Sequence, residues 1–224
     1  MTSTHSLTFY TADTPNGHKI AIYLEEAGLA HDRVLVDLPA GEQRSPAYLA
    51  INPNGKIPAI VDHDTGLAVF ESGAILGYLA AKTGCLQPDT LAERTAVQQW
   101  LHFQIGGIGP MLGQLWWFLH ASKTVNAEAI DRYRKEALRL YGVVNGRLSE
   151  SAYLASSRYS IADIAAFPWL RTAAELDLDV TGFPHVERWL AEIAARPAVQ
   201  RGLIAGRLAA GKTLFSFVVN VSNA

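Results

Sequence analysis

Two short stretches carry the residue types best suited to chemistry, and each lies where an apolar strand runs into a helix. The first is Thr14-Pro15-Asn16-Gly17, which follows the apolar run 7–10 and precedes a helical pattern. This layout is typical of the active-site turn of redox proteins, but the cysteines of such a turn are missing. Thr14 suits the cap of the helix, whose free amides would stabilise an anion such as a thiolate. The spacing fits a plain helix start and a thiolate site equally well.

Glu71 and Ser72 form the second stretch, where the strand pattern ending at Phe70 gives way to a helix. The first amides of that helix and the Ser72 hydroxyl could hold a carboxylate, while Glu71 could pair with an ammonium group. A ligand with both charges on one carbon fits this pair. A plain helix cap with a favourably placed acid is the alternative. Ile57-Pro58 also enters a strand, where proline must lie at an edge or follow a cis bond.

The composition predicts a soluble globular protein. The 224 residues are 49% hydrophobic and 18% charged, enough for a full core in one large or two small domains. A net charge of -2 without a basic run argues against nucleic-acid partners. We expect no membrane partner and a cytoplasmic location, because the N-terminus lacks signal-peptide features and no apolar run approaches the roughly 20 residues that span a bilayer. The single Cys85 excludes an internal disulfide and a cysteine-pair metal site, so we expect no metal.

The two halves of the chain differ in their patterns. The first half predicts the order βαβ, a short linker helix and ββα, with strands at 7–10, 33–38 (buried), 59–62 and 67–70 and helices at 15–28 and 71–84. The second half is helical from Thr90, with a break at 106–110 and helices at 127–150, after Ser160, and at 184–195 and 198–209. We therefore expect an α/β domain at 5–87, an all-α domain at 90–210, and a tail at 211–224 of unknown role.

Five segments together give the chain a family resemblance. The motifs TPNGHK, NPNGKIPAIVD, FESGAIL, GGIGPMLGQ and YSIADIA resemble those of the glutathione transferases, most closely the bacterial nu class of disulfide-bond reductases. The resemblance runs from about Leu7 to about Arg207. It implies a thioredoxin-like N-terminal domain on an all-helical C-terminal domain, a cis bond before Pro58, and a homodimer with a cleft between subunits. It also implies that glutathione, as co-substrate, brings the missing thiol.

The resemblance assigns the parts of glutathione to positions in this chain. The glycine side of its main chain and its cysteine would lie along Gln43 and the Ile57 backbone. Glu71 and Ser72 would hold the γ-glutamyl end. Arg132 would reach the peptide from the C-terminal domain, of the same or the neighbouring subunit.

The resemblance also implies which residues activate the sulfur of glutathione, and a second residue competes for that role. Thr14 and Asn16 would face the sulfur, in place of the tyrosine, serine or cysteine of other classes. Tyr10, at the end of the first strand, occupies about the place of an activating tyrosine in several classes. Its position in the strand pattern suits a core or interdomain role at least as well, so we favour Thr14.

The substrate pocket departs from the class. The stretch QLWWFLHASKTV carries Trp116, Trp117 and Phe118, heavier and more apolar than close members of the class. Adjacent tryptophans on a helix point in different directions, so at least one should reach the pocket or the dimer interface.

Three functions fit these observations. The first is a glutathione-dependent disulfide reductase with some peroxidase activity, acting on a small disulfide or peroxide. The second is conjugation of glutathione to an apolar electrophile, which the aromatic pocket favours. The third is a non-catalytic glutathione-binding scaffold. The full polar set argues against the scaffold, because a scaffold has no need of Thr14, Asn16, Gln43, Glu71, Ser72 and Arg132.

Overall fold

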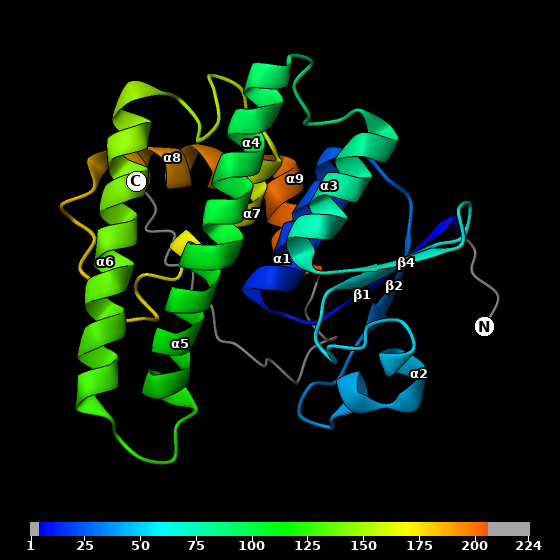
Figure 1. Cartoon of the computed structure of the whole chain (residues 1–224), viewed down its shortest axis with the longest axis horizontal. Coiled ribbons are helices and arrows are strands. Elements are labelled where there is room, and N and C mark those ends of the chain that lie inside the picture. Colours follow the sequence, from blue (N-terminus) through cyan, green and yellow to red (C-terminus); the bar gives the residue numbers. More distant parts are fainter. Residues whose placement is uncertain (1–4, 206–224) are drawn as a thin grey trace.

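The structure is a computed structural model, and it describes residues 5–205. The end of the helix expected at 198–209 and the whole tail 211–224 therefore lie outside the described residues. Figure 1 shows two parts side by side, a small sheet with its helices and a larger group of helices. They correspond to the α/β half and the all-α half expected from the sequence pattern.

The N-terminal half is built around a four-stranded sheet with the strand order β2-β1-β3-β4. Strand β1 runs parallel to β2 and antiparallel to β3, and β3 forms an antiparallel hairpin with β4. The elements are β1 (Leu7–Thr11), α1 (Pro15–Glu26), β2 (Asp32–Leu35), η1 (Glu42–Arg44), α2 (Pro46–Leu49), β3 (Ala59–Asp62), β4 (Leu67–Phe70) and α3 (Ser72–Thr83). The βαβ unit, the linker helix and the ββα unit are all present.

The expectation of a buried strand at 33–38 was wrong. Strand β2 is shorter, its Arg33 is exposed, and Val34 is 40% exposed. The reason is topological, because β2 lies at the edge of the sheet with β1 as its one neighbour. The burial comes after the strand ends, at Val36, whose amide donates to the carbonyl of Thr11 at 2.8 Å.

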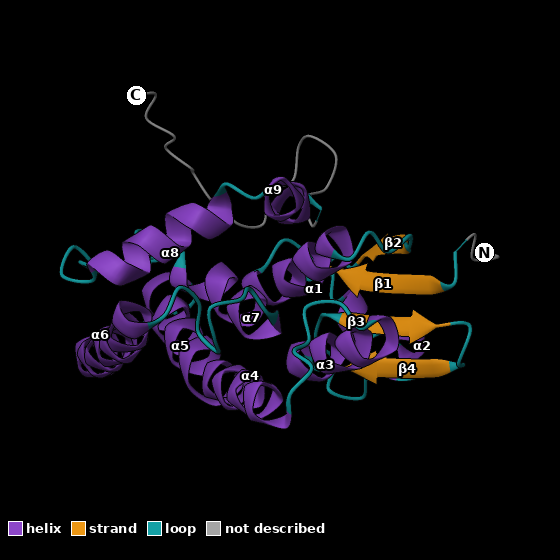
Figure 2. Ribbon diagram, turned by 90° about the horizontal axis from the view of Figure 1, so that it is seen from above, coloured by secondary structure: helices purple, strands orange, loops and turns teal. Residues whose placement is uncertain are grey.

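Helix α1 is buried on nearly all sides because it lies between the sheet and the C-terminal helices. Figure 2 shows α1 and α3 in that intermediate layer. Helix α1 packs against α3, α7 and α9, and its side chains from Ile20 to Leu24 are at most 2% exposed. Gly202 permits the approach of α9, since a Cβ there would lie 2.7 Å from the backbone of Ile22. The two halves thus share one core.

The C-terminal half is entirely helical within the described residues. Its elements are α4 (Leu91–Phe103), η2 (Gln104–Ile108), α5 (Gly109–His120), α6 (Ala127–Glu150), α7 (Ile161–Leu170), α8 (Pro184–Ala194) and α9 (Pro197–Ile204). The break expected at 106–110 takes the form of a π-helical turn, η2, that joins α4 to α5. Helix α7 begins where the helix after Ser160 was expected, with a capping box of Ser160 and Asp163. Burial raises the pKa of Asp163 to about 6, and Trp189 also donates to its carboxylate.

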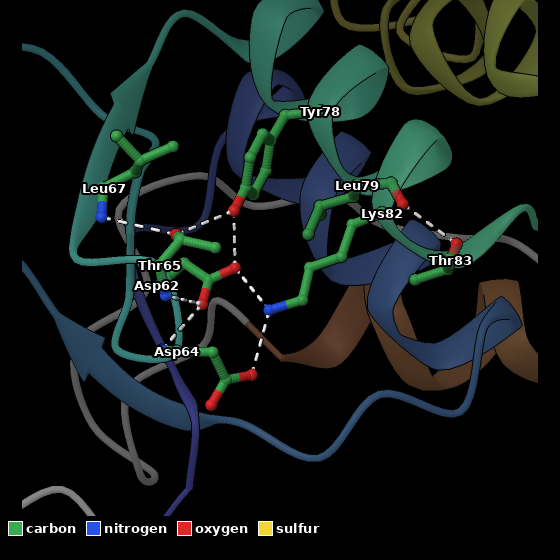
Figure 3. Close-up of polar contacts among 8 residues, drawn as sticks. All are labelled: Asp62, Asp64, Thr65, Leu67, Tyr78, Leu79, Lys82 and Thr83. Carbon is green, nitrogen blue, oxygen red and sulfur yellow. Dashed lines mark hydrogen bonds and ion pairs between the residues drawn. The ribbon is translucent and has the colours of Figure 1, made fainter.

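A polar cluster ties α3 to the β3–β4 hairpin (Figure 3). Asp62, at the end of β3, accepts hydrogen bonds from Tyr78 at 2.6 Å and from Lys82 at 2.5 Å. Lys82 also donates to Asp64, and Thr65 bonds to Tyr78. Burial alone would raise the pKa of Asp62, but these hydrogen bonds and that from the Asp64 amide hold it below its ordinary value. This hairpin cluster (Asp62, Asp64, Thr65, Tyr78 and Lys82) fixes the C-terminal half of α3 against the sheet.

Candidate active site

Two adjoining cavities lie between the N-terminal and C-terminal halves. The Thr14 cavity, of about 460 Å³, is lined by residues that include Thr14, Gln43, Leu176 and Glu175. The Ser72 cavity, of about 450 Å³, is lined by residues that include Lys19, Asn54, Glu71, Ser72, Gln104 and Trp117. Both share the wall residues Asn16, Lys56, Ile57, Gly113, Trp116 and Trp169. Because they share these walls, one extended ligand can run from one cavity into the other.

Thr14 caps α1 and keeps a donor for a ligand. Its backbone is extended, and its Oγ1 accepts a hydrogen bond from the Gly17 amide at 3.2 Å. A hydroxyl accepts and donates at once, so the proton of Thr14 remains for an acceptor in the cavity. Gly17 keeps the turn tight, because a Cβ there would lie 2.3 Å from the carbonyl oxygen of Ala12. The cap role and the role beside a sulfur are therefore compatible.

Asn16 is held by a residue that sequence reasoning missed. Trp169 of α7 donates its indole N–H to Oδ1 of Asn16 at 3.0 Å. Because an indole nitrogen can only donate, this bond fixes which end of the Asn16 amide faces the tryptophan. The Nδ2 protons of Asn16 are then left for another acceptor. The one sequence signal at Trp169 was its place in an apolar helix, which predicts core packing.

Tyr10 lies elsewhere. Its ring packs edge-on against Tyr48 of α2, with 5.9 Å between centroids. It belongs to a small apolar cluster with Val36 and Ala59, whereas its neighbour Phe9 is in the main core. Successive strand residues point to opposite faces of a sheet. Tyr10 lines neither cavity, and this placement favours Thr14 over Tyr10 as the residue beside a sulfur.

Gln43 and Ile57 lie together on the wall of the Thr14 cavity. The side-chain amide of Gln43 donates to the Leu38 carbonyl at 3.3 Å, and its buried Oε1 has no partner among the described residues. The peptide bond between Ile57 and Pro58 is cis. Strand β3 begins only at Ala59, so the Ile57 backbone precedes the sheet ladder. The contact of Gln43 and Ile57 with a peptide backbone stays a prediction.

Glu71 and Ser72 meet at the start of α3 in a strained turn. Glu71 has φ 69°, a value that non-glycine residues rarely adopt and that is frequent at functional sites. Glu71 occupies the cap position without making a side-chain cap, and its Oε1 accepts from Asn54 at 3.3 Å. Ser72 is the first helical residue rather than the cap, and it is 5% exposed. The first amides of α3 therefore have no side-chain cap from Glu71, as an anion site requires.

Lys19 is the second residue that sequence reasoning missed. It lies on α1, is 1% exposed, and lines the Ser72 cavity. Its ammonium donates to Ser72 Oγ at 3.1 Å and to Gln104 Oε1 at 2.6 Å. Burial lowers its pKa to about 7, against the opposing effect of the negative charge of Glu71. The sequence held a signal, because Lys19 lies one helical turn before Tyr23 and next to Ile20, where a charged side chain is unusual.

The three aromatic residues predicted for the substrate pocket have different places. Trp116 lines both cavities, and its indole N–H donates to Glu175 Oε1 at 2.6 Å. Trp117 lines the Ser72 cavity and is 46% exposed. Phe118 lines neither cavity, since its ring stacks on Tyr133 of α6 with 5.7 Å between centroids. The structure therefore brings Trp116 and Trp117 to the site within one subunit, and Phe118 to α6.

Arg132 is not brought to the cavities within one subunit. It is exposed on α6 and lines neither cavity. A contact between Arg132 and a peptide in these cavities would need a neighbouring subunit, and it stays a prediction.

Residues 5–205 hold no group of three or more His, Cys, Asp or Glu side chains arranged to bind a metal ion. None of their helices has the length and apolar character needed to cross a membrane.

Comparison with known proteins agrees with this geometry. Residues 14–82 match the family model of the glutathione S-transferase N-terminal domain, and residues 109–197 match that of the C-terminal domain. The chain is 48% identical over 204 residues to the disulfide-bond oxidoreductase YfcG of Escherichia coli (strain K12), covering 89% of this chain and 95% of that protein.

Two crystal structures of glutathione transferases resemble the fold closely. The protein from Burkholderia graminis, with two glutathione molecules per subunit, has a TM-score of 0.85 at 45% identity. The match covers 89% of this chain and 88% of that protein's chain. The protein from Pseudomonas putida, with one glutathione disulfide per subunit, has a TM-score of 0.84 at 43% identity. The match covers 89% of this chain and 91% of that protein's chain. The α/β half is thus the expected thioredoxin-like domain, and the all-α half is the expected helical domain. The chain belongs to the glutathione transferase family.

Proposed function

We propose that the protein is a glutathione-dependent disulfide-bond reductase with some peroxidase activity, in which the reacting sulfur belongs to glutathione. The bound thiolate attacks one sulfur of a small disulfide, forms a mixed disulfide and releases one product thiolate. A second glutathione thiolate then attacks the glutathione sulfur of the mixed disulfide and releases the other product thiolate. The result is one glutathione disulfide for each substrate disulfide reduced.

A peroxide would react at the same thiolate. The sulfur attacks the peroxide oxygen and releases the alcohol after protonation, which leaves a glutathione sulfenic acid. A second glutathione condenses with the sulfenic acid and releases water. The products are again glutathione disulfide and the reduced substrate.

The observation that carries the proposal is the pair of donors at the N-terminus of α1. Thr14 has a hydroxyl proton left over, and Asn16 has its Nδ2 protons left over. A thiol has an ordinary pKa of about 8.5, and donors at a helix N-terminus lower that value and raise the thiolate fraction. Cys85 lines neither cavity. The chain therefore offers groups that stabilise a thiolate and depends on a ligand to supply one.

The proposal assigns the remaining parts of glutathione to other residues of the two cavities. The γ-glutamyl end would enter the Ser72 cavity, with its carboxylate at Ser72 and its ammonium group at Glu71. Its cysteine backbone would run past Ile57, and its glycine end past Gln43. Two relatives support a site with room for two glutathione units, since one holds two glutathione molecules per subunit and another holds one glutathione disulfide. Reduction of a disulfide by glutathione needs two glutathione thiols.

Conjugation of glutathione to an apolar electrophile is the second candidate. Leu38, Trp116, Trp169 and Leu176 line the Thr14 cavity. Such an apolar wall beside a thiolate suits an aromatic substrate. The same thiolate would attack carbon and expel a leaving group such as chloride, without a second glutathione.

Turnover of three substrates with glutathione tests the proposal. We expect measurable turnover of 2-hydroxyethyl disulfide, slower turnover of cumene hydroperoxide, and little turnover of 1-chloro-2,4-dinitrobenzene. The matched control is Cys85→Ala, which should keep full activity because the reaction uses no protein thiol. Turnover confined to the aryl halide would favour conjugation. Glutathione binding without turnover of any substrate would favour a scaffold.

We also infer a homodimer and a cytoplasmic location. Arg132 is exposed on α6 and lines neither cavity of its own subunit, so its proposed contact with the peptide requires a partner subunit. Sedimentation should give a mass close to twice 24.3 kDa. A monomer with full activity would rule out a role for Arg132 across subunits. A reductase that consumes glutathione suits a compartment kept reducing by that thiol, as the cytoplasm is.

A further inference from the structure

Lys19 lies where three segments from both halves of the molecule meet. It belongs to α1, and its ammonium contacts Ser72 at the start of α3 and Gln104 at the start of η2. Both partners are neutral, and Lys19 itself is 1% exposed. The described part of the chain has no ion pair that includes Lys19. A buried ammonium without an opposite charge is costly unless a ligand supplies the charge.

Each member of this group keeps a donor that the protein does not use. An ammonium has three N–H groups, and Lys19 spends two of them on Ser72 and Gln104. Ser72 accepts from Lys19, so its own hydroxyl proton is left. Gln104 is 0% exposed, and its Nε2 has no hydrogen-bond partner among the described residues. All three line the Ser72 cavity. A carboxylate, with four lone pairs, is the ligand that such a set of donors requires.

The other groups around Lys19 leave this assignment intact. Glu71, before α3, accepts from Asn54 and acts on Lys19 through its charge at longer range. On α1 itself, His18 bonds to Asp13. Lys56, before β3, is an exposed cation of the same cavity. The residues that α5 and α7 contribute to this cavity are uncharged. Among these groups, Glu71 is the one that acts on Lys19 as an opposite charge, and we assign it to the ammonium group of the ligand.

We propose that Lys19, with Ser72 and Gln104, binds the α-carboxylate of the γ-glutamyl group of glutathione and is its buried counter-charge. This inference rests on the proposed function, because it takes glutathione as the ligand. It adds a binding residue that belongs to α1 and makes the carboxylate bridge both halves of the molecule through Gln104.

Proton uptake on binding follows from the charge. With a pKa of about 7 in the free protein, Lys19 is largely neutral above pH 7. A carboxylate beside it favours the protonated form, so the ligand and a proton bind together. Affinity for the ligand is then full below pH 7 and falls as the pH rises. If the bound pKa exceeds 9, affinity between pH 6.5 and pH 8.5 falls by roughly 20-fold.

The test uses S-methylglutathione, whose blocked sulfur removes the thiol titration from the measurement. Calorimetric titration in buffers of different ionisation enthalpy gives the number of protons taken up. For the wild-type protein at pH 8 we expect clear uptake and the fall in affinity described above. Lys19→Met should abolish both and weaken binding at pH 6.5 by roughly 10- to 100-fold, the range for a lost charge-assisted hydrogen bond. Lys56→Met, the matched control, should weaken binding but keep the proton uptake.

A second ligand checks the carboxylate itself. In S-methyl-4-aminobutyryl-cysteinylglycine the α-carboxylate is absent and the amine is retained. The wild-type protein should bind it at least 10-fold more weakly. In Lys19→Met the difference between the two ligands should be smaller but not zero, because Ser72 and Gln104 remain. Binding without proton uptake, or equal loss of affinity for both ligands in the variant, would overturn the assignment and leave the proposed function standing. Failure of the wild-type protein to bind S-methylglutathione would instead remove the proposed function. The wild-type measurements decide the question even if Lys19→Met does not fold.

Discussion

The two ends of helix α3 carry two lysine clusters of opposite character. At the C-terminal end, Lys82 donates to two carboxylates, Asp62 and Asp64, and its side chain is 32% exposed. At the N-terminal end, Lys19 contacts Ser72 and Gln104, which carry no charge, and it is 1% exposed. The pKa of Lys82 is raised by the hydrogen bond that it donates to the Asp62 carboxylate, whereas burial lowers the pKa of Lys19 to about 7.

The difference separates a structural site from a binding site. In the hairpin cluster every charge has a partner within the protein, so the cluster stabilises the fold without help from a ligand. Around Lys19 no carboxylate of the described residues makes an ion-pair contact and donors remain unused, which weakens the free protein and leaves favourable contacts for a ligand. One helix thus carries a site of stability at one end and a site of recognition at the other. Variants at the two ends should therefore affect different measurements.

The largest effect is expected at the hairpin end. Asp62→Ala removes the shared acceptor of Tyr78 and Lys82 and should lower the free energy of unfolding by about 3 kcal/mol, the scale of two charged hydrogen bonds. Urea unfolding of the variant and the wild-type protein measures this difference in free energy. Since the pKa of Asp62 is lowered, its contribution is present above the unfolded value of about 3.9 and is lost as the pH falls below it.

Two controls define this result. Asp131→Ala removes an exposed ion pair with Lys135 and should change stability by less than about 0.5 kcal/mol. Glutathione affinity of the folded Asp62→Ala protein should stay within about threefold of the wild-type value. A loss of affinity without a loss of stability would contradict the comparison.

Glu71→Gln should affect glutathione binding rather than stability. The variant keeps the size of the side chain but loses the charge that would pair with the ligand's ammonium group. We expect glutathione binding to weaken by about 1 to 3 kcal/mol, with little change in unfolding. Calorimetric titration gives the dissociation constant. An unchanged constant would remove Glu71 from the site.

Thr14→Ala extends the comparison to the start of α1, where the chemistry is expected. The variant loses the hydroxyl donor but keeps the helix amides and Asn16, so disulfide turnover should fall by roughly 10- to 100-fold, or about 1.4 to 2.7 kcal/mol. Glutathione binding should be largely retained. Tyr10→Phe should have much less effect, because Tyr10 packs against Tyr48 away from both cavities. The pH dependence of turnover distinguishes the two residues. If Tyr10→Phe raises the apparent thiol pKa and Thr14→Ala does not, tyrosine is the activating group.

The parts of the site that sequence could predict are those set by local structure. Helix starts are read from a few adjacent residues, so Thr14 and Ser72 were found from their spacing. The order of the elements and the helix start after Ser160 were confirmed for the same reason. Strand β2 was misjudged because its apolar residues predict burial, and only the strand order shows that it lies at an edge.

The parts that were missed depend on contacts between the halves. Trp169 meets Asn16 across 153 positions of sequence, and Gln104 meets Lys19 across 85. No local pattern reports such contacts. Phe118 shows the same limit, because only the position of α6 explains why it stacks on Tyr133. The pattern could place the groups that begin helices, but not those that join the domains around a ligand.

The smallest expected effect is on the stability of Lys19→Met. Removing a buried charge is stabilising, but it leaves Ser72 Oγ and Gln104 Oε1 without their donor, so the two changes should cancel to within about 1 kcal/mol at pH 6. Lys82→Met should instead lower stability at that pH, because it leaves the carboxylate of Asp62 without its cation.

The pH dependence of this small difference gives the sharper result. An unfolded lysine has a pKa of about 10.4, and folding lowers that of Lys19 to about 7. Between these values the unfolded chain binds a proton that the folded chain releases, so Lys19 makes wild-type stability rise with pH. Relative to Lys19→Met, the wild-type protein should therefore gain up to about 1.4 kcal/mol per pH unit between pH 7 and pH 9. Urea unfolding of both proteins without glutathione measures the gain. A constant difference would mean that Lys19 keeps its proton through a partner in the free protein, and the contrast between the two ends of α3 would then be lost.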